Sequence, residues 1–172
     1  MQTTSPTRAR AVDYAALEAV FLTGLAGVAS LARRRERATG QRAIPLAELP
    51  VMALATFTVA DLLAHEKVST WLREPFVVES ATHMPLTPRG SGLRYAVGEL
   101  LTCTRCAGTW GALGLVGLRT ASPAVGRTAV AILALAGTND FAQGAFRLLS
   151  ERANAARVPT DGSLGPGEFE DR

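Results

Sequence analysis

The sequence is poor in the residues that most catalytic and nucleic-acid-binding sites use. Among its 172 residues are two histidines, two cysteines and one lysine, and aromatic side chains make up only 6%. It contains none of the short motifs that mark zinc peptidases, P-loop nucleotide sites or dinucleotide sites. It also has no internal repeat of the kind found in transporters. We therefore expect the protein not to be an enzyme, with no catalytic and no cofactor-binding residues.

The basic residues are nearly all arginine and do not predict a nucleic-acid site. Lys67 is the single lysine among 18 basic residues, and the densest cluster is the run ARRRERATGQR at residues 32–42. No aromatic residues are interleaved with these arginines to stack on bases. A basic cluster beside an apolar segment is more typical of a membrane flank that contacts anionic lipid. The expected partner is thus the lipid bilayer, and no nucleic acid is expected. Abundant arginine and alanine indicate a GC-rich, bacterial genome.

Hydrophobic residues make up 48% of the chain and gather in four blocks. The first and third blocks are each 19 residues long, which as helices would span roughly 28 Å, close to the thickness of a bilayer's hydrocarbon core. Neither shows a charged face along most of its length, as a water-soluble helix should. These two blocks predict transmembrane helices. The four blocks are Tyr14–Ala32, Leu49–Ala64, Leu100–Leu118 and Pro123–Leu149.

The second and fourth blocks are less clear, because Asp61 and Asp140 interrupt them. They fit either transmembrane spans or core helices of a soluble bundle. The fold class that we predict is all-α, a small helical transmembrane bundle of three to four spans, located in the cell membrane as a multi-pass protein. Arginine counts on the two sides balance, so the membrane orientation stays open. The expected helices are 14–35, 47–74, 98–118 and 124–150, with no sheet.

The chain is expected to divide into two ends, one extra helix and one membrane domain. Its ends are polar or rich in Gly and Pro and should be disordered. A cleaved signal peptide is the alternative for the first block, but Asp13 and Glu18 intrude on the region that should be purely apolar. The expected parts are residues 1–12 (disordered), 13–35 (an extra N-terminal transmembrane helix), 36–150 (the membrane domain) and 151–172 (a disordered tail).

The connection between the second and third blocks begins with an amphipathic pattern. Val68, Trp71, Leu72 and Phe76 fall near one side of a helix, which Pro75 ends. Such a pattern is typical of an interfacial helix that lies on the membrane surface, with tryptophan at headgroup depth.

A pair of cysteines, Cys103 and Cys106, opens the third block at helical spacing i, i+3. Trp110, Gly111 and Gly114 follow, and small residues in lipid permit close approach between helices. We expect these three residues to face another helix. The thiols themselves fit three roles, which the sequence leaves open: a place in this packing surface, a metal site, or thiol–disulfide chemistry.

A metal site would need further ligands, since two thiolates are half of a tetrahedral zinc site. His65 is the preferred third ligand, because chain continuity brings it to the same side of the membrane as Cys103 and Cys106. Zinc is therefore the one possible cofactor. The redox alternative has no thioredoxin-like βαβ pattern around it.

Three polar residues are expected inside the membrane: Asp61, Arg105 and Asp140. A lone carboxylate in hydrocarbon costs several kcal/mol unless it is paired. We therefore expect Asp140 to face Arg105 or the neighbourhood of Asp61 within the bundle.

Two stretches, ALATFTVADLLAHEKVSTWLREPF and GELLTCTRCAGTW, resemble a bacterial membrane family known as DUF1360. The resemblance covers about residues 49–149, and some members are described as sporulation-associated. It implies a multi-span membrane architecture and no established activity. The function expected is an assembly or scaffolding role through helix association, with a homo-oligomer or another membrane protein as partner. The alternative is a membrane thiol or zinc site with a redox or sensing role.

Overall fold

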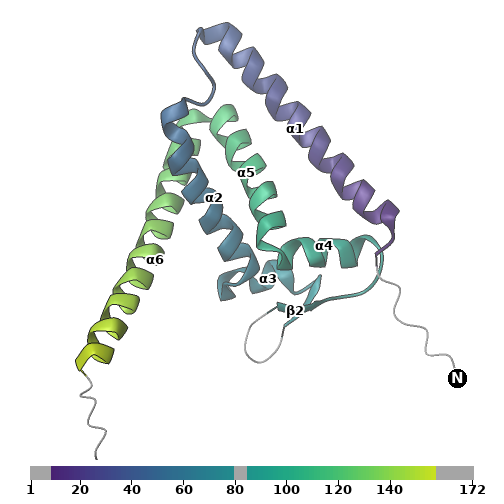
Figure 1. Cartoon of the computed structure of the whole chain (residues 1–172). Coiled ribbons are helices and arrows are strands. Elements are labelled where there is room, and N and C mark those ends of the chain that lie inside the picture. The colour runs from purple at the N-terminus through teal and green to yellow at the C-terminus, as the bar shows by residue number, and fades with distance from the viewer. Residues whose placement is uncertain (1–8, 80–84, 158–172) are drawn as a thin grey trace, which may run out of the picture. The chain divides into compact units, whose positions relative to one another are not determined.

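The computed structural model describes residues 9–79 and 85–157, and the described chain is mostly helical (Figure 1). It begins with α1, Ala11–Thr39. The Asp13 carboxylate accepts a hydrogen bond from the backbone N–H of Arg10 at 2.8 Å, which satisfies one of the free N–H groups at the helix start. Gly40 ends the helix at φ 67°, a left-handed conformation that glycine adopts without strain. The helix is therefore longer at both ends than the predicted 14–35.

The expected helix 47–74 is wrong, because the chain breaks it after Ala64. A 3-10 turn, η1 (Leu46–Glu48), leads into α2 (Leu49–Ala64), and a second turn, η2 (Lys67–Ser69), leads into the four-residue α3, Thr70–Arg73. Arg73 is fully buried and donates from Nη1 to the carbonyl oxygen of Leu63 at 2.9 Å. The chain thus folds back to satisfy a carbonyl that the end of α2 leaves free.

The predicted interfacial helix is therefore two short turns and not one amphipathic helix. Two of its four apolar residues are nevertheless exposed, since Trp71 and Val68 are 74% and 68% accessible.

The expectation of no sheet is also wrong. A small antiparallel hairpin pairs β1 (Val77–Glu79) with β2 (Pro85–Pro88), with Val78 opposite Thr87. β-branched residues and residues that precede proline favour extended backbone, which explains strands at this place. The hairpin lies in the connection between the second and third apolar blocks.

The third block forms two helices, and the predicted single helix 98–118 is wrong. α4 (Leu93–Thr102) ends and α5 (Thr104–Ala121) begins on either side of Cys103, which is extended at φ −99° and ψ 105°. α4 packs against β2. A Cβ atom on Gly98 would lie 2.9 Å from the Cβ of Pro88, so only glycine allows this approach.

The last helix, α6, runs from Pro123 to Arg157. Residues 1–138 form one compact unit, and a second unit begins at Asn139. Residues 151–157 are helical, so the predicted disordered tail does not start at residue 151. Residues 1–8 and 158–172, for which we also predicted disorder, lie outside the described residues.

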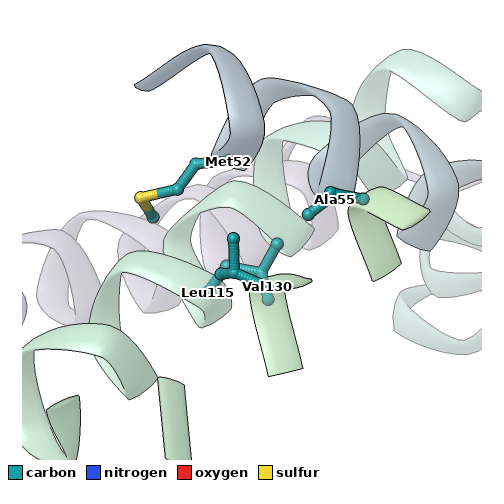
Figure 2. Close-up of a cluster of buried hydrophobic side chains, with 5 residues drawn as sticks. Met52, Ala55, Leu115 and Val130 are labelled. Atoms are coloured by element: carbon teal, nitrogen blue, oxygen red, sulfur yellow. The ribbon is translucent and has the colours of Figure 1, made fainter. Parts of the chain in front are cut away.

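The core of the first unit is small and joins three helices. Figure 2 shows Met52 and Ala55 of α2 beside Leu115 of α5 and Val130 of α6, and Ala134 completes the cluster. The small side chains of Ala55 and Ala134 allow the helices to approach closely. The hydroxyl of Thr58 on α2 also donates to the carbonyl oxygen of Leu133 on α6, at 3.0 Å.

Candidate functional site

The break between α4 and α5 places the two cysteines at a helix N-terminus. Cys103 is the N-cap of α5, and its Sγ accepts a hydrogen bond from the backbone N–H of Cys106 at 3.4 Å. Both cysteines are free; Cys106 is exposed and Cys103 is half-buried. The pKa of Cys103, which lies outside both helices, is held below its ordinary value, chiefly because the Cys106 thiol hydrogen-bonds to it. The backbone N–H of Cys106 adds to this effect, as helix N-termini commonly do.

Both cysteines line one apolar cavity of about 430 Å³ between α1 and the α4–α5 junction. We call it the thiol pocket. Its volume falls within the range of small-molecule sites, which are mostly apolar with a few placed polar groups. Its lining residues are Tyr14, Leu17, Glu18, Phe21, Ala96, Glu99, Leu100, Cys103, Cys106, Thr109 and Trp110.

Two contacts between α1 and the other helices define the walls of the thiol pocket. The rings of Phe21 and Trp110 meet edge to face, with centroids 5.3 Å apart and planes at 66°. The hydroxyl of Tyr14 donates to the carboxylate of Glu99. The Phe21–Trp110 contact is apolar. The Tyr14–Glu99 contact places a hydroxyl group and a carboxylate at the same cavity.

A second cavity, of about 490 Å³, lies between α2 and the start of α5. Asp61 and His65 line it and form an exposed side-chain contact, with 2.8 Å between Oδ1 and Nδ1. Thr104 and Arg105 line it from α5. The first turn of α5 therefore points the cysteines toward α1, and the residues between them toward α2.

This arrangement separates His65 from the cysteines. Within residues 9–79 and 85–157, no three His, Cys, Asp or Glu side chains come together in a way that could hold a metal ion. The structure thus does not assemble the zinc site predicted from Cys103, Cys106 and His65, because the cysteines and the histidine line different cavities.

The residues expected to pack between helices differ in their surroundings. Trp110 contacts Phe21 of α1, and a Cβ on Gly111 would lie 3.0 Å from Cγ1 of Val59 on α2. A Cβ on Gly114 would meet no atom of the described chain within 4 Å. The close approach of α5 to α2 therefore occurs at Gly111.

The polar residues expected inside the membrane are placed only in part. Asp61 and Arg105 line the same cavity. Asp140 is exposed on the part of α6 that belongs to the second unit, so its pairing with Arg105 or Asp61 stays a prediction.

Sequence reasoning missed the contribution of α1 to the thiol pocket. Tyr14, Leu17, Glu18 and Phe21 recur at intervals of three and four residues, so they share one helix face. That spacing was visible in the sequence. The role of Glu99 could not be predicted from the sequence, because only the packing of α1 on α4 brings it next to Tyr14.

Fold and site together describe a mostly helical protein that contains long apolar helices. Within the described residues, two helical stretches are long and apolar enough to cross a membrane: Ala11–Thr39 and Leu46–Ala64. The chain belongs to the family DUF1360, described as a protein of unknown function, whose model matches residues 51–146. The resemblance seen in the sequence is thus confirmed.

One curated relative is the sporulation protein YjcA of Bacillus subtilis (strain 168). The two are 30% identical over 94 residues, which cover 51% of this chain and 80% of that protein. No solved structure matches the chain.

Proposed function

We propose that the protein is a multi-pass integral protein of the bacterial cell membrane that serves as a scaffold, associating with its partners through helix contacts. One observation carries this proposal. The most apolar 18 consecutive residues of α1 are hydrophobic enough to cross a bilayer, and none of them is buried within the chain. Val20, Leu22 and Leu25 are among the exposed side chains. A contiguous apolar surface of this kind requires lipid or a partner to cover it.

We assign the spans to α1, α2, α5 and, as the fourth, the part of α6 before Asn139. The helical stretch Leu46–Ala64, which contains α2, supports this assignment. Only 22% of its most apolar segment is buried within the chain, so most of that segment is left for lipid to cover. In α5, the exposed Arg105 lies in the first turn, where a long side chain can reach the headgroups. Arg119 lies in the last turn, where its charge is paired with Glu48.

A scaffolding role is supported by apolar surface that remains beyond α1. Ile132 and Leu135 on α6 are 63% and 71% exposed. Lipid alone can cover such residues, but helices in membranes also associate through close packing of small residues, which this chain has in abundance. We propose a second copy of the chain or another membrane protein as the partner.

Membrane fractionation and crosslinking test this proposal. The full chain, produced in bacterial cells, should stay in the membrane fraction through alkaline carbonate washing and should need detergent for release. Crosslinking in those membranes should then give a discrete dimer or larger species. Release by carbonate would contradict the membrane assignment, whereas a membrane-bound chain that never crosslinks to itself or another protein would contradict only the scaffold.

The name of the Bacillus subtilis relative supports a role for this chain in sporulation. We propose that it serves there as a membrane component. Replacing the relative's gene by one that encodes this chain should keep the spore yield at that of the parent strain, with the deletion strain as control. A spore yield no higher than that of the deletion strain would contradict the proposal.

A further inference from the structure

The thiol pocket is an apolar cavity lined by a pair of thiols that can donate two electrons. Cys103 and Cys106 both open into it, and a reduced Cys-x-x-Cys pair can give up two electrons by closing to a disulfide. We propose that this pocket binds a lipid-soluble quinone and that the cysteine pair reduces it. The inference rests on the membrane placement proposed above, because such quinones dissolve in the bilayer.

The two thiols lie on one turn at the start of α5. Cys103 as N-cap and Cys106 three residues on lie on the same turn, with the Cys106 N–H 3.4 Å from Sγ of Cys103. Both side chains line the same pocket, so the two thiols open into one cavity. Thiol–disulfide chemistry starts from a thiolate, and the N-terminus of α5 and Arg105 both favour the negative charge on Cys103.

The rest of the pocket suits a flat ring with polar edges. Phe21 and Trp110 provide an aromatic wall, and Leu17 and Leu100 add apolar surface. A quinone ring is flat and apolar on its faces, and aromatic side chains pack on such rings. Its hydrocarbon tail would follow the exposed apolar surface of α1 into the lipid.

The polar end of the pocket provides hydrogen bonding for a quinone oxygen. Tyr14 donates to Glu99 in the structure, and both side chains line the cavity. A tyrosine hydroxyl that turns from Glu99 to a quinone oxygen would hold the ring beside the thiols. Tyr14 and Glu99 would thus be positioning residues, and the two cysteines would be the reacting groups.

The step balances without any further reactant. The Cys103 thiolate adds to a ring carbon of the quinone and forms a C–S bond. The Cys106 thiolate then attacks the Cys103 sulfur, so that an S–S bond forms and the C–S bond breaks, leaving its electron pair on the ring. The two protons lost by the thiols end on the two quinone oxygens. The quinone is reduced to a hydroquinone, and the dithiol is oxidised to a disulfide.

A single-turnover experiment tests the proposal on the full chain in liposomes of phosphatidylcholine and phosphatidylglycerol. The reduced protein is mixed with decylubiquinone without oxygen, and hydroquinone formation and free thiols are measured together. We expect one quinone reduced and two thiols lost per chain. Cys106→Ser should form no disulfide and should release no hydroquinone.

A matched pair of variants on α1 separates binding from chemistry. Leu17→Ala enlarges the thiol pocket and should raise the quinone concentration needed for half-maximal rate several-fold, with little change in the reactivity of the thiols toward a soluble alkylating agent. Leu31→Ala removes an exposed leucine that does not line the pocket, and it should leave this concentration unchanged. Equal effects of the two variants would overturn the pocket assignment.

Flotation of the same liposomes separates this inference from the proposed function. A chain that floats with the lipid yet keeps both thiols under excess quinone would overturn the quinone proposal alone. A chain that does not float would overturn the membrane placement and, with it, this inference.

Discussion

Arg119 and Glu48 form a bidentate ion pair across the first unit. Nε and Nη2 of Arg119 donate to the two carboxylate oxygens of Glu48, both at 2.8 Å. The pair joins the C-terminal end of α5 to the turn that precedes α2. The Arg119 side chain is only 7% exposed, against 31% for that of Glu48. Planar two-point pairing of this kind fixes geometry as well as adding energy.

Loss of the Glu48 charge should destabilise the protein. Glu48→Gln leaves the guanidinium of Arg119 buried without its counter-charge, which should lower the free energy of unfolding by about 1–3 kcal/mol. Thermal unfolding in detergent micelles measures this as a lower Tm. Glu151→Gln, on an exposed part of α6, is the control and should have no effect. A Tm equal in both variants would show that the pair contributes nothing.

Gly111 and Gly114 should respond differently to the same substitution. Gly111→Leu drives a side chain into Val59 of α2, and overpacking of this kind costs about 1–3 kcal/mol. Gly114→Leu meets open space and gains helix propensity, so it should be neutral or slightly stabilising. Chemical unfolding of the two variants in micelles compares them. Equal stability would mean that α5 does not approach α2 at Gly111.

Charges on the exposed face of α1 should prevent its insertion. Leu22→Arg combined with Leu25→Arg places two charges near the middle of the helix, each costing about 2.5–3.5 kcal/mol on insertion scales. The fraction of chain that resists carbonate washing should fall sharply. Gln41→Arg adds a charge just beyond α1 and should leave this fraction unchanged. Full retention of the double variant would argue against α1 as a span.

The contact between Phe21 and Trp110 should be visible in fluorescence. In a Trp71→Phe background, Trp110 is the single tryptophan left. Phe21→Ala removes its edge-to-face partner, so quenching of Trp110 by a small soluble quencher should increase. The free energy of unfolding should also fall by about 0.5–1.5 kcal/mol for the lost ring contact, in addition to the effect of the lost buried area. Phe146→Ala, at an exposed position of α6, serves as the comparison. Unchanged quenching in Phe21→Ala would mean that α1 does not cover Trp110.

Local composition was enough to locate most of the helices. The first, second and fourth apolar blocks became α1, α2 and α6, and the third became the end of α4 and most of α5, because long apolar runs favour helix. The motifs that resembled DUF1360 were also readable, since residue identity and spacing are properties of the chain alone. Even the face of α1 that lines the thiol pocket was encoded in the spacing from Tyr14 to Phe21.

Tertiary contacts decided where the helices break and what their side chains meet. After α2 ends at Ala64, Arg73 folds back onto the carbonyl of Leu63, a contact that the local sequence does not predict. Because the helix is interrupted at Cys103, α5 is oriented independently of α4. In this orientation the thiols line the cavity beside α1, and Arg105 lines the cavity beside α2. Residues that are distant in sequence meet only through such packing, so the sequence alone placed Cys103, Cys106 and His65 together and the structure separates them.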